Sequence, residues 1–302
     1  MSDKRHDARD LIFGTDWWTD CDDVAALDIL LKAHKKGMIN LRCVGINSVM
    51  EYSAASVDAL CESEGVFVPI GVDKSAVRDG NECKYQKALA SYSTKKPSIS
   101  DCPDAYKLYR KALSESKGGA VIVEVGFPQI IAELLRSPPD EISPLDGKSL
   151  VSEKVSEIRL MAGRWDTPNG REYNLCAYPV NAEAGSYICE NSPVPLVFLG
   201  FEVGYEVITG KDLPSEGLVG LSFELKNGSR RGNPSWDPMT ALAAVIGDDE
   251  KAGYRRVYGK ASVDPGTGEN NFTEDENGSH CYLIKTMPDE YYATEIDKIL
   301  KL

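Results

Sequence analysis

Four aspartates lie within eight residues near the N-terminus, at positions 16, 20, 22 and 23. Two ionised carboxylates about 5 Å apart repel each other by roughly 3 kcal/mol at an effective dielectric of about 20. Such a cluster favours a bound cation, and Ca²⁺ suits it because Ca²⁺ accepts many oxygen ligands from flexible loops. The same residues also fit a second explanation, in which Asp20 or Asp22 caps a helix and the acidic first turn interacts with the helix dipole.

The acidic segment connects two elements that the sequence predicts clearly. Residues 11–13 (Leu-Ile-Phe) read as a buried strand, and residues 23–36 read as an amphipathic helix that ends before Gly37. In open α/β sheets, ligands bind at the carboxyl ends of the strands. The aspartates therefore lie where a binding site is expected.

Strand-like and helix-like runs continue to alternate along the chain. We predict strands at 41–46, 66–72, 120–125, 157–162 and 194–199, and helices at 54–62, 104–115, 128–136 and 180–190. Residues 73–101 are predicted to be a long loop. The last 90 residues are less regular, with a helix from Pro238, strand-like runs at 253–263 and 280–286, and a terminal helix from Asp289. The pattern predicts one α/β domain over residues 1–302, with a predominantly parallel, mixed sheet flanked by helices.

The composition limits the partners of this chain. Its 34 Lys+Arg and 47 Asp+Glu give a net charge of −13, and it has no long basic run. We therefore exclude a nucleic-acid polymer and an anionic membrane surface as partners, and expect a small ligand or a metal cation. No apolar stretch is long enough to span a membrane. The polar N-terminus shows no signal peptide, and the eight cysteines form no CxxC pair, so we expect reduced, buried thiols in a cytoplasmic protein.

The acidic segment resembles the N-terminal signature of the inosine–uridine nucleoside hydrolases, in which an Asp-Thr-Asp turn and a short loop precede Asp-Asp-Ala and an apolar helix. Thr15-Asp16 and Asp22-Asp23 stand at the matching places. A phosphatase of the haloacid dehalogenase type is set aside, because its second aspartate would fall at Trp18. Four later segments, in the same order as in the family, resemble its Gly-Pro-Leu-Thr-Asn-Ile-Ala, Met-Gly-Gly, Glu-Phe-Asn and His-Asp-Pro motifs: 125–132, 161–163, 172–174 and 236–238.

The resemblance implies a Ca²⁺-dependent enzyme that cleaves the N-glycosidic bond of a ribonucleoside to give ribose and a free base, as in purine or pyrimidine salvage. It implies that Asp22 is the general base for the attacking water. Calcium ligands would come from Asp16, Asp23 and Asp237, and from the backbone carbonyl at Gln129. Substrate contacts would come from Glu172 and Asn174, with Asn47, Met161, Asn169 and Trp236 as further candidates. We also expect a homo-oligomer.

Several residues depart from the family pattern. Gly14 replaces the first Asp of the signature, and Trp236 stands where several members have a histidine near the leaving base. None of the three histidines, His6, His34 and His280, is an evident general acid. Two alternatives therefore stay open: a non-catalytic ribose or nucleoside binder that keeps the metal loop, and a hydrolase of the same family that acts on another N-riboside. Asn47 and Asn169 also fit ordinary strand-end or turn positions, and Trp17-Trp18 could stack on a base or fill a subunit contact.

Overall fold

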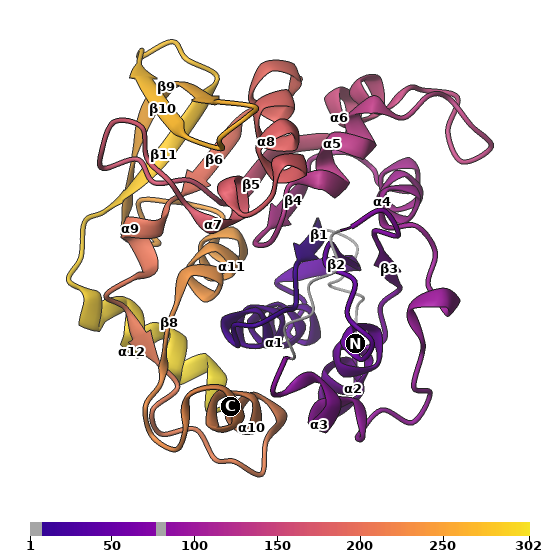
Figure 1. Ribbon diagram of the computed structural model, residues 1–302, viewed down its shortest axis with the longest axis vertical. Coiled ribbons are helices and arrows are strands. Elements are labelled where there is room, and N and C mark those ends of the chain that lie inside the picture. Colours follow the sequence, from indigo (N-terminus) through magenta and orange to yellow (C-terminus); the bar gives the residue numbers. More distant parts are fainter. Residues whose placement is uncertain (1–7, 77–82) are drawn as a thin grey trace.

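The computed structural model describes residues 8–76 and 83–302 (Figure 1). Its strand β1 (Arg9–Thr15) is an interior strand of a large sheet, and Leu11, Ile12 and Phe13 in it are fully buried. Burial of successive side chains is typical of a strand with helices on both faces. β1 pairs in parallel with β2 (Ile39–Ile46) and with β4 (Ala120–Glu124). Because β1 ends at Thr15, the acidic segment begins at the carboxyl edge of the sheet.

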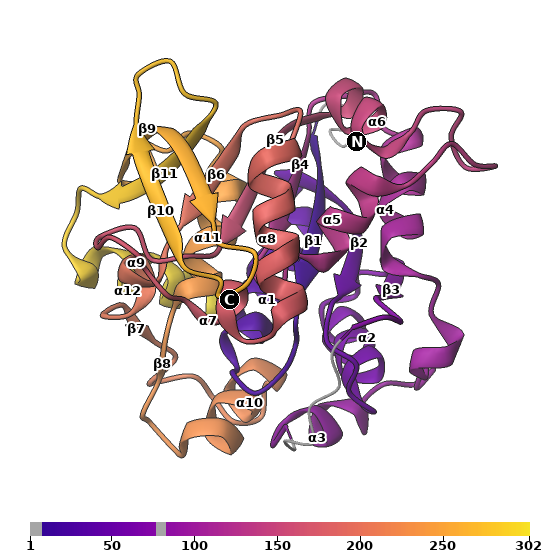
Figure 2. The same cartoon turned by 45° about the horizontal axis from the view of Figure 1, so that its top comes forward.

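Nine strands of the described ranges form this sheet, in the order β10-β9-β11-β6-β5-β4-β1-β2-β3. The strands not yet given are β3 (Ile70–Val72), β5 (Val155–Met161), β6 (Leu196–Leu199), β9 (Tyr254–Val263), β10 (Asn270–Glu274) and β11 (His280–Lys285). β9 pairs antiparallel with both β10 and β11 at one end of the sheet (Figure 2), whereas the other pairings are parallel. The predicted single-domain α/β class with a predominantly parallel, mixed sheet is confirmed.

Helices cover both faces of the sheet, and a hydrophobic cluster fills each interface. One face carries α1 (Asp22–Lys35), α2 (Ser53–Glu64), α11 (Trp236–Ile246) and α12 (Asp289–Leu300). The other face carries α4 (Ala105–Ser114), α5 (Gln129–Arg136), α6 (Gly147–Lys154) and α8 (Pro179–Asn191). α1 and α11 pack directly on each other although they come from opposite ends of the chain (Figure 1).

Short elements connect the larger ones at the edge of the sheet. They are α3 (Gln86–Ala90), a 3₁₀ turn (Ile99–Asp101), α7 (Tyr173–Cys176), α9 (Phe201–Gly204), α10 (Leu218–Asn227) and the two-stranded pair of β7 (Ile208–Thr209) and β8 (Asn233–Pro234). α7 and α9 follow the strands β5 and β6, so both begin near the carboxyl edge where β1 ends.

The structure differs from the prediction between residues 66 and 101. We predicted a strand at 66–72, but β3 is confined to Ile70–Val72. The preceding Pro69 has no N–H to donate, although its carbonyl accepts a hydrogen bond from the backbone N–H of Val44 at 3.0 Å. The predicted loop at 73–101 contains α3 and the 3₁₀ turn, and its residues 77–82 lie outside the described residues.

Helices α6 and α10 were not predicted, and each contains a glycine, a residue that lowers helix propensity. Close packing requires both glycines. A Cβ atom at Gly147 would lie 1.6 Å from the backbone oxygen of Leu134, and one at Gly220 would lie 2.1 Å from the backbone oxygen of Pro214. Tertiary packing therefore outweighs the local preference in these two segments.

All eight cysteines are free thiols, and each is buried except the half-buried Cys176. This agrees with the expectation that they pack as small apolar side chains. Within residues 8–76 and 83–302, no helix has both the length and the apolar character that a membrane crossing needs.

Candidate active site

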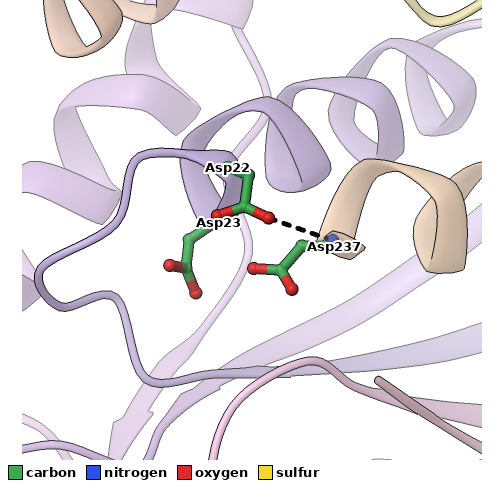
Figure 3. Close-up of side chains that lie close together, drawn as sticks. All are labelled: Asp22, Asp23 and Asp237. Carbon is green, nitrogen blue, oxygen red and sulfur yellow. Dashed lines mark hydrogen bonds between the residues drawn. The ribbon is translucent and has the colours of Figure 1, made fainter. Parts of the chain in front are cut away.

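Three buried aspartates converge at the carboxyl edge of the sheet. Asp22 and Asp23 form the first turn of α1, and Asp237 lies in the first turn of α11 (Figure 3). One carboxylate oxygen from each lies within 4.8 Å of the others. The backbone N–H of Asp237 donates to Oδ2 of Asp22 at 3.2 Å. The packing of α1 on α11 therefore joins acidic groups from the two ends of the chain.

The loop before α1 fixes the orientation of the Asp23 carboxylate. Its Oδ1 accepts hydrogen bonds from the Thr15 hydroxyl and, at 3.2 Å, from the backbone N–H of Trp17. Trp17 has a left-handed backbone, with φ of 49°, and its indole N–H donates to the Ser56 hydroxyl at 2.6 Å. Trp17 is therefore a buried anchor of the loop. The next residue, Trp18, donates its backbone N–H to Oδ1 of Asp16 at 3.1 Å.

The pKa values of the four acidic groups are strongly raised. Burial, and then repulsion from neighbouring carboxylates, raises the pKa of Asp16, Asp22 and Asp237 well above the ordinary aspartate value. Burial raises the pKa of Asp23 to about 7, although its hydrogen bonds from Thr15 and Trp17 oppose this shift. Four carboxyl groups that disfavour one another's charge form a site that a cation would stabilise.

This titration predicts how stability depends on pH. The folded-state pKa values of Asp23 and Glu172, both about 7, are raised above the unfolded value of roughly 4. The contribution of these two groups to the free energy of unfolding is therefore fully present below about pH 4 and is lost as pH rises through 7. We expect the melting temperature of the metal-free protein to fall between pH 5.5 and pH 8.

Calcium is expected to reverse that loss. A free Ca²⁺ concentration of about 100 times Kd stabilises the folded protein by about 2.7 kcal/mol, which corresponds to a rise of several degrees in melting temperature. Differential scanning fluorimetry at both pH values, with Mg²⁺ as the control ion, measures the effect. The shift caused by Ca²⁺ should be larger at pH 8. Equal shifts at the two pH values, or none, would contradict a site built from these acids.

A cavity of about 420 Å³ opens above the aspartates. Its acidic floor and its aromatic walls come from loops that follow β1, β4, β5 and β6 and from the start of α11. The lining residues are Asp16, Trp18, Thr19, Asp20, Asp22, Asp23, Val125, Met161, Arg171, Glu172, Tyr173, Asn174, Phe201, Trp236 and Asp237. The volume is that of a small-molecule site.

Two aromatic clusters contribute to the lining of this cavity. In the first, the ring centroids of Trp18 and Tyr173 are 6.2 Å apart, and Trp18 stacks on Tyr178. In the second, Trp236 packs on Phe201, with centroids 5.5 Å apart, and its indole N–H donates to the Phe201 carbonyl. Flat apolar walls over a row of carboxylates suit a ligand with one polar part and one planar part.

No protein-family model matches this sequence, and no curated protein matches it. Solved structures do. The inosine-uridine preferring nucleoside hydrolase from Bacillus anthracis superposes with a TM-score of 0.66 at 13% identity, over 97% of this chain and 99% of that one. An inosine-guanosine nucleoside hydrolase gives 0.65 at 15% identity, over 97% and 99%. The type III effector protein XopQ, complexed with adenosine diphosphate ribose, gives 0.68 at 15% identity, over 97% and 94%.

The chain has the nucleoside hydrolase fold. The superposition covers nearly the whole of both chains, as the motif order in the sequence led us to expect. Within this fold, eight of the eleven candidate site residues from the sequence line the cavity described above: Asp16, Asp22, Asp23, Met161, Glu172, Asn174, Trp236 and Asp237.

Three of the residues singled out from the sequence do not line the cavity. Asn47 is fully buried, with its amide between Glu124 and the backbone N–H of Phe127. Gln129 donates its side-chain amide to Asn181 at 2.8 Å. Asn169 is exposed in its loop and is hydrogen-bonded to Asn271. In the turn after β4, Val125 lies at the cavity in place of Gln129.

Hydrogen bonds fix the orientation of Glu172 and Asn174 in the lining of the cavity. The Glu172 carboxylate accepts hydrogen bonds from the backbone N–H groups of Asn174 at 2.7 Å and Gly163 at 3.0 Å. Asn174 donates its side-chain amide to the carbonyls of Val125 and Met161, both at 2.9 Å. Both amide hydrogens are thereby used, so its side-chain oxygen is the atom that can accept a hydrogen bond from a ligand.

Among the described residues, no histidine lines the cavity. The ring nitrogen Nδ1 accepts a backbone hydrogen bond in His34, from Leu41, and in His280, from Ala261. His6 lies outside the described residues. Five lining residues were not among the candidate site residues chosen from the sequence: Thr19, Val125, Arg171, Tyr173 and Phe201. Three of these positions gave a usable signal, because Arg171 and Tyr173 flank Glu172 and Phe201 follows the carboxyl end of β6.

Proposed function

We propose that this protein hydrolyses the N-glycosidic bond of a ribonucleoside, with Ca²⁺ bound by the aspartates of the cavity. The observation that carries the proposal is the convergence of the Asp22, Asp23 and Asp237 carboxylates under a cavity with aromatic walls. The nucleoside hydrolase fold supports it, since two of the structures with this fold are described as nucleoside hydrolases.

The residues present fit a hard divalent cation. Their donor atoms are carboxylate oxygens, and within the described ranges the charged groups that act most strongly on Asp16, Asp22 and Asp237 are other acids. We propose Asp16, Asp23 and Asp237 as the ligands, together with the backbone carbonyl at Gln129. Bound there, Ca²⁺ would lower the pKa of a coordinated water and orient the hydroxyl groups of the ribose.

Asp22 is the proposed general base. Its carboxylate lies beside those of Asp23 and Asp237, and burial and neighbouring carboxylates raise its pKa, which makes it a stronger proton acceptor than an ordinary aspartate. Cleavage of the bond between base and sugar develops positive charge on the ribosyl carbon, as in other glycoside hydrolysis. The acidic floor stabilises that charge. We propose that Glu172 and Asn174, which line the cavity, hydrogen-bond the sugar hydroxyls.

The aromatic walls are the proposed site for the base. Trp18, Tyr173, Phe201 and Trp236 would stack on a purine or pyrimidine ring. Trp236 occupies the place where we expected a histidine in related enzymes, and its indole N–H is already bonded to the Phe201 carbonyl. We therefore propose that solvent, rather than a histidine, protonates the departing base. A homo-oligomer, a cytoplasmic location and a role in nucleoside salvage stay predictions from the sequence.

A ribose or nucleoside binder without turnover is the second candidate. The absence of a histidine from the described cavity lining favours it. So does the fold shared with XopQ, a protein solved with adenosine diphosphate ribose. Adenosine diphosphate ribose contains an N-glycosidic bond between adenine and ribose. The third possibility, hydrolysis of an N-riboside other than a simple nucleoside, would therefore use the same acidic residues.

A substrate panel separates these candidates. The protein is incubated with inosine, uridine, guanosine, cytidine and adenosine diphosphate ribose in the presence of Ca²⁺, and the free base that is released is measured by chromatography. We expect release of the base from at least one nucleoside and none after chelation with EGTA. Binding by calorimetry without release from any nucleoside would favour the binder. Release from adenosine diphosphate ribose alone would favour the different substrate.

A further inference from the structure

Glu124, the last residue of β4, occupies an unusual place beside the acidic loop. It is paired in register with Gly14 of β1, and its side chain is buried, with the residue 1% exposed. A Cβ atom at Gly14 would lie 2.1 Å from Oε2 and 2.5 Å from Cδ of Glu124. The Glu124 carboxyl group therefore fills the space that a side chain at position 14 would occupy.

Only one oxygen of this carboxyl group is hydrogen-bonded. Oε1 accepts from the side-chain amide of Asn47 at 2.7 Å and from the backbone N–H of Gly126 at 3.2 Å. Oε2 is buried and has no hydrogen-bond partner within the described part of the chain. A fully buried carboxyl oxygen without a partner is rare, because its desolvation is uncompensated. Buried titratable groups of this kind are frequently found at functional sites.

The hydrogen bonds of Glu124 lead directly to the proposed metal loop. Asn47, held by Glu124, donates its backbone N–H to the Thr15 carbonyl at 2.9 Å. Gly126, also held by Glu124, lies so close to the loop that a Cβ atom there would be 2.2 Å from the backbone nitrogen of Asp16. The Glu124 carboxyl group thus connects the turn after β4 with Thr15 and Asp16, at the start of the acidic loop.

We propose that Glu124 is a positioning residue of the metal centre, which supplies from β4 the carboxyl group that the acidic loop lacks at position 14. This inference rests on the proposed function. The Glu124 carboxyl group holds the turn at Gly126 against Asp16. Burial raises the pKa of Glu124 to about 8, and a cation bound at Asp16 and Asp23 would favour its ionised form, so its negative charge would in turn favour cation binding. Groups that support metal ligands in this way typically change metal affinity about 10–100-fold when they are removed.

The first test removes the charge and keeps the shape. Glu124→Gln is expected to weaken Ca²⁺ binding at least about tenfold in isothermal titration calorimetry. The melting temperature of the metal-free variant, compared with the wild type, verifies that it folds. Wild-type affinity in Glu124→Gln would overturn the inference and leave the proposed metal centre intact. Absence of Ca²⁺ binding by the wild-type protein would overturn both.

The second test moves the carboxyl group to the neighbouring strand. In Gly14→Asp/Glu124→Ala, the truncated residue 124 makes room for Asp at position 14, and we expect Ca²⁺ affinity to recover to within about threefold of the wild type. The matched control, Gly14→Asn/Glu124→Ala, has the same size without the charge and should stay at least about tenfold weaker. Equal affinities of the two double variants would mean that the position needs volume only, and would overturn the inference.

Discussion

Replacing Asp22 by Asn is expected to abolish nucleoside cleavage while Ca²⁺ stays bound. The substitution keeps the size of the side chain and removes the group that accepts the proton of the attacking water. Loss of a general base typically costs 10²- to 10⁴-fold in rate. We therefore expect kcat to fall by about 10³-fold. Asp16, Asp23 and Asp237 remain, so Ca²⁺ affinity measured by calorimetry should change far less than kcat.

Asp20→Asn is the matched control for Asp22→Asn. Asp20 lines the same cavity and lies in the same loop, and its Oδ1 accepts a hydrogen bond from the backbone N–H of Cys21 at 2.8 Å. We expect it to retain most of the activity. If Asp22→Asn keeps activity within a few fold of the wild type, Asp22 is not the base. If its Ca²⁺ affinity falls as far as its rate, Asp22 acts as a ligand.

Replacing Asp237 by Ala is expected to weaken Ca²⁺ binding more strongly than any other single change in the C-terminal half. Asp237 is buried, and it is the carboxylate by which α11 completes the group on α1. We expect the affinity to fall at least about 100-fold, with the Ca²⁺-induced rise in melting temperature lost at millimolar Ca²⁺. Calorimetry and scanning fluorimetry measure the two effects.

Asp248→Ala provides the control for this second prediction. Asp248 follows α11 closely in sequence, but its carboxylate pairs with Lys251 at 2.8 Å on the surface. The Ca²⁺ affinity of Asp248→Ala should equal that of the wild type. Unchanged Ca²⁺ binding in Asp237→Ala would show that the pairing of α1 with α11 does not build the metal site.

The sequence predicted the acidic floor well because its pattern is local. Asp16, Asp22 and Asp23 fall between a buried strand and an amphipathic helix, and that arrangement alone places them at the carboxyl edge of the sheet. Asp237 came from the order of motifs, and the packing of α11 on α1 explains why so distant a residue arrives there. Hydrophobic periodicity does not encode which helices become neighbours.

Which of the proposed substrate contacts line the cavity was harder to predict, because motif spacing does not show where a side chain points. Asn47 follows a strand at the correct edge, yet its amide is used by Glu124 and Phe127 below the cavity. Asn169 lies close to Glu172 in sequence, but its loop turns outward and pairs with Asn271. The relation between Gly14 and Glu124 was invisible to the sequence, since it depends on the register of two non-consecutive strands.

A crystal structure of the protein grown with Ca²⁺ tests the central claim most directly. The account predicts a single ion at the bottom of the cavity, with carboxylate oxygens of Asp23 and Asp237 about 2.3–2.6 Å from it. An ion bound elsewhere, or no ion at saturating Ca²⁺ with these two carboxylates turned apart, would contradict it.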